Sequence, residues 1–357
     1  MSVARSWPGR PIGLAAIVSL CALVLAPGAG AASWGSPEKV SLPAQSANPS
    51  ELFLSANPSG RSVAVWRDAA GTVVAAALLP AGSFDFQGPN VISDGSGPTG
   101  PKVSVGNGGV AVAAWQTTSG DDLIKAARLD ATATSFGAAA IALDSPTGGE
   151  SVTEPAVAVT PGGKATIVAD GPFTFFPFSH EWATVQGPAG GAWSAADDFH
   201  GNNENQFSKL VAGDHESVIW LGKHDTCCNQ RAYSTAGMTA ATSDWVGGAG
   251  IAFGDGNGAG CLCGFGHDLA RLADGDAIVL ISRNSGGTGQ DLSTGTYDLA
   301  RAQGGSTVIP ETPLTTDPVN RAGGDRRIVA NSAGATAAVW AGIAGDVWVA
   351  IRPNGGS

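Results

Sequence analysis

Two stretches of the chain, PSGRSVAVW at Pro58–Trp66 and NGGVAVAAW at Asn107–Trp115, follow one plan. In each, a glycine is followed six residues later by a tryptophan, and small or branched apolar residues lie between them. Four more places keep this offset in whole or in part: Gly163 with Ala169, Asp214 with Trp220, Gly275 with Ile281 and Gly334 with Trp340. The anchors recur about every 50 to 60 residues, a period typical of stacked or circular β arrays.

Each repeat contains short apolar segments separated by turn residues. In the first repeat they are Leu52–Ala56, Ser62–Trp66, Thr72–Leu79 and Phe84–Ile92. Four such segments joined by tight turns predict one antiparallel four-stranded sheet, here called a blade. Six repeats therefore predict an all-β fold, a six-bladed β-propeller of four-stranded antiparallel blades. The expected blades are 51–93, 101–145, 154–199, 207–253, 267–315 and 326–357, within a single domain of residues 33–357. A linear solenoid or a two-sheet sandwich is the alternative.

The sixth repeat lacks a fourth strand, because the sequence stops at Ser357. The segment Trp34–Leu42 has the aromatic start and apolar end of the fourth strands elsewhere. We therefore expect residues 34–42 to complete the last blade and close the ring. Closure of this kind would leave no open sheet edge.

Residues 1–32 have the features of a secretory signal peptide: Arg5 and Arg10, the apolar run Ile12–Leu25, and a small-residue exit ending at Ala32. A membrane anchor and a lipid attached at Cys21 are less favoured alternatives. Removal of this segment changes the formal charge from −11 to 17 − 30 = −13. So acidic a chain disfavours nucleic acid as a partner. No second apolar run is long enough to span a membrane, so we expect a secreted protein, and a monomer.

Four cysteines remain after the signal segment: Cys227, Cys228, Cys261 and Cys263. In a secreted protein an even number favours disulfides, whereas the spacing lacks the C-x₂-C pairs of zinc sites. Adjacent cysteines pair only with strain, so cross-pairing of the two loops is expected. Cys227 with Cys263 and Cys228 with Cys261 is preferred, and the other cross-pairing remains open.

The loops between the second and third strands and between blades should share one face, which also carries both cysteine pairs. We expect a ligand site on this face and expect no metal and no cofactor there. Its candidate residues are Asp170, Phe175, Phe176, His180, His200, Glu204, His224, Asp225, His267, Asp268, Arg283 and Arg327. Histidines, carboxylates and arginines around a depression can bind a sugar or a peptide. An ordinary solvated rim has the same composition. The four tryptophans Trp66, Trp115, Trp220 and Trp340 share one repeat position, which favours packing between blades over a role in ligand stacking.

The six-repeat plan resembles sialidases, which are six-bladed propellers, in architecture alone. The sialidase turn motif S-x-D-x-G-x-x-W is absent, and only Tyr233 and Tyr297 could supply the tyrosine that those enzymes use. No nucleophile elbow, phosphate loop or H-E-x-x-H motif is present either. Two function classes remain, besides a purely structural scaffold. The favoured one is a secreted propeller that binds an extracellular glycan or protein. The alternative is an extracellular glycoside hydrolase or lyase with acidic residues near the propeller axis.

Overall fold

The computed structural model describes residues 50–95, 97–118, 122–144, 152–171, 179–203, 205–212, 217–224, 232–238, 245–252, 268–272, 276–284, 290–297, 312–315, 322–331, 334–344 and 346–353. All of them belong to the compact unit Val40–Ser357. Within these ranges the chain forms strands and turns and no helix. The all-β prediction is therefore confirmed.

The first four repeats each form an antiparallel sheet of four strands. The first holds β1 (Ser50–Ala56), β2 (Ser62–Arg67), β3 (Val74–Leu79) and β4 (Gln87–Val91). The second holds β5 (Pro98–Val105), β6 (Ala111–Thr117), β7 (Ile124–Leu129) and β8 (Ala140–Leu143). The third holds β9 (Thr153–Val159), β10 (Ala165–Asp170), β11 (Ser179–Gln186) and β12 (Asp197–Asn203). The fourth holds β13 (Asn205–Ala212), β14 (Val218–His224), β15 (Ala232–Met238) and β16 (Val246–Ala252).

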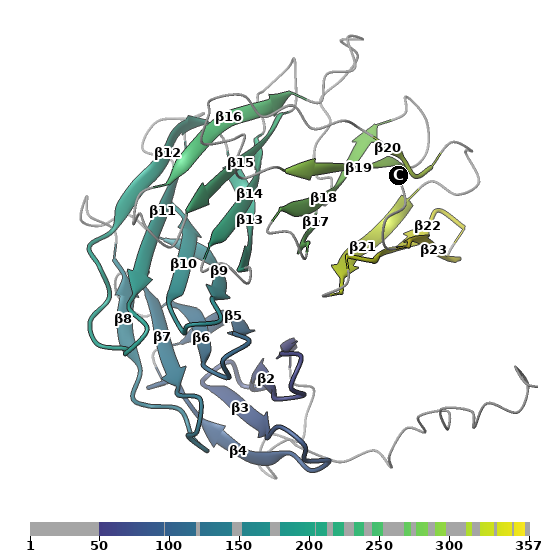
Figure 1. The fold of residues 1–357 in the computed structure, drawn as a ribbon. Helices are drawn as coiled ribbons and strands as arrows, with labels where there is room; N and C mark the ends of the chain where they lie inside the picture. Colours follow the sequence, from purple (N-terminus) through teal and green to yellow (C-terminus); the bar gives the residue numbers. More distant parts are fainter. Residues whose placement is uncertain are drawn as a thin grey trace, which may run out of the picture. The chain divides into compact units, whose positions relative to one another are not determined.

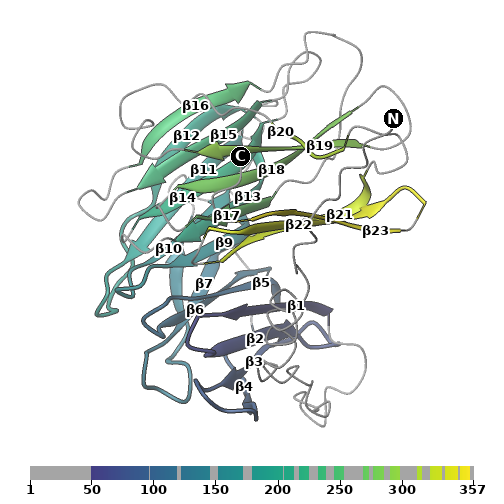
Figure 2. The same cartoon turned by 45° about the vertical axis from the view of Figure 1, so that its right-hand side comes forward.

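The fifth and sixth repeats share one seven-stranded sheet, so the six expected units appear as five sheets. The fifth repeat contributes β17 (Asp268–Arg271), β18 (Ala277–Asn284), β19 (Gln290–Tyr297) and the short β20 (Thr312–Pro313). The sixth contributes β21 (Ala322–Ala330), β22 (Thr336–Gly342) and β23 (Val347–Arg352), which lie side by side in Figure 2. A single pair, Gln290 with Ala322, joins the two groups. We therefore treat them as blades 5 and 6. Residues 34–42, which the sequence predicts to complete blade 6, lie outside the described residues.

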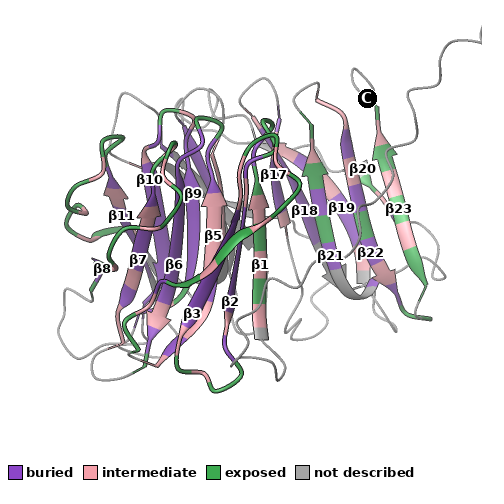
Figure 3. Ribbon diagram, turned by 90° about the horizontal axis from the view of Figure 1, so that it is seen from below, coloured by how far each residue is buried: buried purple, intermediate pink, exposed green. Residues whose placement is uncertain are grey.

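The sheets follow one another in chain order, and the first strand of each blade lies nearest the common centre (Figure 1). Consecutive first strands are in contact from β1 to β5 and onward through β9, β13, β17 and β21. The second strands β2, β6 and β10 are buried on both faces (Figure 3). Continuous apolar runs rather than strict alternation are the expected sequence of such strands.

The repeated glycine closes the turn between the first and second strands. The N–H of Gly60 donates to the carbonyl of Asn57 at 3.0 Å, and the N–H of Gly109 donates to that of Gly106 at 2.8 Å. Gly60 has a φ of 85° and Gly109 a φ of 89°, a left-handed conformation that side chains disfavour. The glycine recurs because the turn geometry recurs.

Three of the four tryptophans pack between blades, as the sequence predicts, whereas the described residues that pack with Trp66 belong to its own blade. Trp66, Trp115, Trp220 and Trp340 are all buried. Trp115 packs among blade 1 residues, and Trp340 packs among residues of blade 5. The register corrects the expectation that the four tryptophans share one position. Trp66 stands four residues after Ser62, where the pairing with the first strand begins, whereas Trp220 stands only two residues after the equivalent Val218. Trp220 fills a comparable space from a shifted position, edge-on to Phe199 with ring centroids 5.2 Å apart.

Two arginines donate hydrogen bonds from one blade to the next. Both lie at the end of the blades where the first strands finish. Arg61 of blade 1 donates to the carbonyls of Ala131, Asp130 at 3.1 Å and Ala133 at 2.8 Å, all in blade 2. Arg128 of blade 2 repeats the arrangement by donating to carbonyls of blade 3. Guanidinium groups suit this role because their donors form a rigid fork.

Candidate functional site

The first strands begin irregularly, and this irregularity shapes the centre of the molecule. The pairing between the first and second strands shifts between Ser50 and Phe53 in β1 and between Thr99 and Lys102 in β5. Strands β9, β13 and β21 have the same kind of shift near their starts. Such bulges redirect side chains and are frequent beside functional sites. Here they lie in the innermost strand of five of the six blades, and the described pairing of β17 with β18 is regular.

The bulge places a residue in the left-handed region at equivalent positions of the first three blades. Gly100 has a φ of 60°, whereas Glu51 and Glu154 take φ values of 54° and 49°. A side chain there costs about 1 kcal/mol. Glu51 is held in place, because its carboxylate accepts hydrogen bonds from the Gly100 N–H at 2.7 Å and the Thr99 hydroxyl at 3.4 Å. Its Oε1 also lies 3.6 Å from Nη1 of Arg67.

Each of the six first strands carries at least one charged residue; β17 also carries Arg271, and β21 also carries Asp325 and Arg326. The charges compared below alternate in sign along the chain. Lys102, Lys209, Asp268 and Arg327 occupy one register position, three residues before the end of the strand pairing with the second strand. In blades 1 and 3 the carboxylate instead stands two residues earlier, at the left-handed bulge position. We call this set the axial cluster: Glu51, Lys102, Glu154, Lys209, Asp268 and Arg327.

The electrostatic environment of Lys102 shows that these charges act on one another. Burial is the main cause that lowers the pKa of Lys102 from 10.5 to about 8, and the positive charge of Lys209 lowers it further. The carboxylates of Glu154 and Glu51 oppose this shift, and Arg327 of blade 6 adds to it. A charge in the last blade thus acts on a side chain in the second. Charges of four other blades therefore act on Lys102.

Lys102 is also held over an aromatic ring. Its Nζ lies 3.7 Å from the centroid of Phe53, which occupies the equivalent register position in blade 1. A cation over a ring face gains about 0.5 to 2 kcal/mol, depending on its desolvation. By contrast, the side chains of Lys209 and Glu154 make no hydrogen bond or ion pair within the part of the chain that the structure describes.

Asp268 joins blades 5 and 6 at the same level. Its Oδ2 accepts a hydrogen bond from the N–H of Ile328 at 2.9 Å. Burial raises the pKa of Asp268, whereas the bond from Ile328 and the positive charge of Lys209 act in the opposite direction. Burial therefore pushes Asp268 and Lys102 towards their neutral forms. Environments of this kind tune acids and bases in active sites.

Blade 3 adds a pair of buried carboxylates, of which the sequence predicts only Asp170 as a site residue. Asp170 and Glu181 are directly opposed on β10 and β11, and Glu181 is fully buried. On its other side Glu181 pairs with His200 of β12. Asp170 also pairs with Thr153, beside Glu154 of the axial cluster. These positions share the strand ends at which the axial cluster lies.

Of the sequence-predicted candidates, the structure describes three with their side chains: Asp170, Asp268 and Arg327. Asp268 and Arg327 belong to the axial cluster. Four more are placed by their backbone in strands rather than in loops: His180 in β11, His200 in β12, His224 in β14 and Arg283 in β18. The others lie outside the described residues: Phe175, Phe176, Glu204, Asp225, His267, Cys227, Cys228, Cys261 and Cys263.

The sequence holds a signal for the axial cluster that loop composition does not reveal. Lys102, Asp268 and Arg327 each stand seven residues before the turn glycine of their repeat, and Glu51 and Glu154 stand nine residues before theirs. Counting backwards from each glycine would have aligned these charges. They lie in short, regular segments rather than in the long, polar loops where a site is expected.

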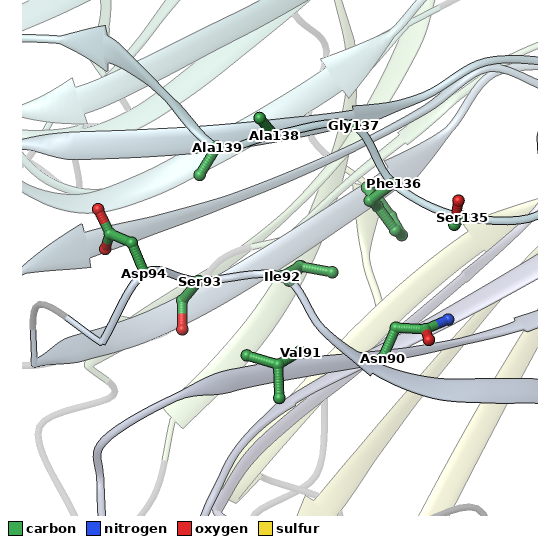
Figure 4. A pocket seen from close by; sticks show the side chains of 10 residues that line it. All are labelled: Asn90, Val91, Ile92, Ser93, Asp94, Ser135, Phe136, Gly137, Ala138 and Ala139. Carbon is green, nitrogen blue, oxygen red and sulfur yellow. The ribbon is translucent and has the colours of Figure 1, made fainter.

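A pocket of about 530 Å³ lies elsewhere, between the outer parts of blades 1 and 2. The segments 90–94 and 135–139 line it, as Figure 4 shows. Its carboxylate, Asp94, forms an ion pair with Lys125. None of the predicted site residues and no member of the axial cluster lines this pocket. The charges that could engage a ligand gather at the centre instead.

Within the described residues, no group of three or more His, Cys, Asp or Glu side chains is arranged to hold a metal ion. That same part of the chain contains no helix of the length and apolarity that crossing a membrane requires.

No family model matches the chain, and no curated protein is similar to it in sequence. Solved structures do resemble it. A protein of unknown function from Dyadobacter fermentans DSM 18053 has a TM-score of 0.50 at 11% identity, over 85% of this chain and 93% of that one. An ulvan lyase of polysaccharide lyase family PL25 has a TM-score of 0.50 at 9% identity, over 84% of this chain and 80% of that one.

The fold is a β-propeller. A Hadza microbial sialidase also resembles it, with a TM-score of 0.48 and 13% identity, and the alignment covers 84% of this chain but 64% of the sialidase. At such identities the likeness concerns the fold alone. Propellers of one shape serve unrelated functions, so the function of this chain has to be argued from its own residues.

Proposed function

We propose that the protein is a secreted propeller that binds an extracellular acidic polysaccharide at the axial cluster. The observation that carries the proposal is that charges on the first strands of different blades act on Lys102 and on Asp268 near the centre of the molecule. Lys209 has no partner among the described residues, and Lys102 and Arg327 add positive charge around it. Cations gathered in this way bind carboxylate or sulfate groups.

The net charge of the chain makes such a site selective. At 17 − 30 = −13 after removal of residues 1–32, the protein repels polyanions from most of its surface. An acidic polysaccharide would therefore contact the protein where Lys102, Lys209 and Arg327 lie, while the carboxylates of Glu154 and Asp268 accept hydrogen bonds from sugar hydroxyls. Alternating charges fit a ligand that carries both acid groups and hydroxyls. A propeller of similar fold acts on a polysaccharide, the PL25 ulvan lyase.

Secretion forms part of the proposal because the ligand is extracellular. It rests on the signal-peptide features of residues 1–32 and on the four cysteines that follow them. N-terminal sequencing of exported protein tests it, with Ser33 expected as the first residue. An uncleaved or cytoplasmic product would contradict the proposed location.

Binding is tested by titrating the mature protein, residues 33–357, with a polyuronate and with a neutral polysaccharide of similar length. We expect binding of the polyuronate alone, with an affinity that falls as salt rises. Lys209→Met should weaken it by about 10-fold to 100-fold, because a charge-assisted hydrogen bond contributes about 1.5 to 3 kcal/mol. Lys125→Met, at the outer pocket, is the matched control and should bind as the wild type does. Equal affinities of wild type and Lys209→Met would overturn the assignment of the site.

A second candidate function is a hydrolase or lyase that acts at the same cluster. The observation that favours it is the opposite pair of shifts: burial raises the pKa of the acid Asp268 and lowers that of the base Lys102 to about 8. Pairs of groups tuned in this way supply general acids and bases. In a lyase reaction, Lys102 would accept the proton next to a uronate carboxylate while the glycosidic C–O bond breaks and a C=C bond forms. Asp268 would give its proton to the departing oxygen.

Two measurements on the same incubation separate binding from turnover. New reducing ends without ultraviolet absorbance indicate hydrolysis, and reducing ends together with the absorbance of an unsaturated uronate indicate elimination. Neither signal at saturating polysaccharide would leave the binding function and contradict the enzymatic one. Lys102→Met, which keeps the stem but has no proton acceptor, should abolish elimination.

A further inference from the structure

The pocket of about 530 Å³ between the outer parts of blades 1 and 2 has an apolar floor. Ile92 is buried in the core that the two blades share, and Phe136 and Ala139 are half-buried against that core. In Figure 4 the ring of Phe136 and the side chain of Ala139 point from their segment towards the segment 90–94, and Asp94 points back towards them. A cavity of this volume suits a small molecule.

Polar side chains with unused hydrogen-bonding groups surround this floor. Asn90 and Ser135 line the pocket, are exposed, and make no side-chain hydrogen bond within the part of the chain that the structure describes. An amide and a hydroxyl can each donate and accept. Ser93 differs, because its Oγ accepts a hydrogen bond from the N–H of Val74 at 2.8 Å, which leaves its own proton to donate. The rim therefore offers donors and acceptors beside an aromatic ring.

The charge at the pocket favours a neutral ligand. Asp94 lines the pocket and forms an ion pair with Lys125, whose side chain is 17% exposed, whereas that of Asp94 is 49% exposed. The accessible part of the carboxylate can accept charge-assisted hydrogen bonds from hydroxyl groups. An acid group at the same place would be repelled by Asp94 and would compete with it for Lys125. A neutral ligand rich in hydroxyls fits the pocket better than an acidic one.

The wall formed by residues 137–139 consists of small residues that the backbone does not require. A Cβ added at Gly137 would meet the carbonyl oxygen of Arg128 at 3.6 Å, an ordinary van der Waals contact, and the φ of Gly137 lies outside the left-handed region. Blade 3 has Trp193 and Ser194 at the equivalent positions, since the N–H groups of Gly137 and Ser194 donate to equivalent residues of their third strands. Residues 137–139 thus leave open a space that larger side chains could fill.

We propose that this outer pocket binds a neutral pyranose at the end of a saccharide chain. One face of such a ring consists largely of C–H groups, which pack on the ring of Phe136, while its hydroxyls reach Asn90, Ser135 and Asp94. The volume encloses one or two sugar rings, so a chain end fits better than the interior of a polymer. A long neutral polysaccharide has few ends and gives no measurable binding at concentrations that saturate the axial cluster. The pocket is independent of the function proposed for that cluster.

Saturation-transfer NMR of the mature protein, residues 33–357, tests the ligand class with matched sugars. The probes are the methyl glycosides of glucose, galactose and mannose, each compared with the methyl glycoside of its uronic acid. We expect at least one neutral glycoside to bind with a dissociation constant in about the millimolar range, as suits a ligand of so few atoms. Its uronic counterpart should bind about 3-fold more weakly or worse, because of Asp94. Absence of binding by all three neutral glycosides would overturn the proposal, and so would equal affinity for the acidic forms.

Substitutions at the pocket test the place of binding. Ala139→Leu puts a larger side chain into the cavity and should weaken glycoside binding about 10-fold or more. Asn90→Ala, at an exposed residue whose loss should leave the melting temperature unchanged, should weaken it about 3-fold to 10-fold through one lost hydrogen bond. Ala81→Leu is the matched control, because Ala81 is exposed in a turn of blade 1 and does not line the pocket. Wild-type affinity in folded Ala139→Leu and in Asn90→Ala would overturn the proposal.

The two proposed sites are separated by exchanging their probes. Polyuronate affinity should be unchanged in Asn90→Ala, and glycoside affinity should be unchanged in Lys209→Met. Loss of glycoside binding in Lys209→Met would place the sugar at the axial cluster and overturn the pocket proposal. If the glycoside binds at the pocket and the polyuronate does not bind the wild type, the function proposed for the axial cluster alone is contradicted.

Discussion

The two halves of β5, the first strand of blade 2, differ in what their side chains do. Towards its end, Val105 is buried and packs with Trp115 between blades 1 and 2. Towards its start, Lys102 carries its charge to the centre, where charges of other blades act on it. The apolar end repeats with little change from blade to blade, whereas the charged end changes sign. Stability and recognition are therefore separated along each first strand.

The largest expected effect comes from the apolar side of this comparison. Trp115→Ala should lower the free energy of unfolding by about 3 to 5 kcal/mol, because the side chain is fully buried between blades. Urea unfolding at neutral pH measures it. Phe84→Ala is the control, since Phe84 is 97% exposed and its truncation should change stability by less than about 0.5 kcal/mol. Equal effects of the two substitutions would contradict the assigned core.

A smaller loss is expected at the ties between blades. Arg61→Met keeps the apolar stem but leaves three carbonyls of blade 2 without their donor, so the free energy of unfolding should fall by about 2 to 3 kcal/mol. Lys125→Met removes an ion pair at the outer pocket and should cost less than about 1 kcal/mol. Polysaccharide affinity should be unchanged in both, because neither residue lies at the axial end. A loss of affinity in folded Arg61→Met would show that the two regions are coupled.

The sequence predicts the apolar side of the comparison far better than the charged side. Turn glycines such as Gly60 and Gly109 recur because one backbone conformation recurs, so the blades can be counted from them. Trp220 is shifted by two residues, since any large side chain that fills the space suffices. The signs of Lys102 and Glu154 follow no periodic rule. Their meeting depends on strand register and on bulges, which only the folded chain shows.

Because Lys102 has a lowered pKa, both the stability of the fold and the affinity for a polyuronate should depend on pH, and the direction of each change can be predicted. The folded chain lowers its pKa from 10.5 to about 8, so the native state binds fewer protons than the unfolded one between these values. Stability should therefore rise as pH rises from about 8 to 10.5, and below about 8 the cost of burying the charge is fully present. Affinity for a polyuronate should fall as pH rises through about 8, because the folded Lys102 loses its charge there. Lys102→Met should remove this residue's contribution to both trends, measured by urea unfolding and by titration. A wild-type affinity that is independent of pH would contradict a role for Lys102 in binding.

The smallest expected effect comes from glycine substitutions at Glu51 and Glu154, two residues with similar backbone conformations whose carboxylates differ in their contacts. Glu154 has a φ of 49° and no hydrogen bond among the described residues, so Glu154→Gly should relieve strain and raise stability by up to about 1 kcal/mol. Glu51 has a similar φ of 54°, yet its carboxylate accepts the Gly100 N–H and lies near Arg67, so Glu51→Gly should destabilise. Urea unfolding of both variants gives the two signs. If both substitutions change the free energy of unfolding in the same direction, the contacts of the Glu51 carboxylate do not stabilise the fold as proposed.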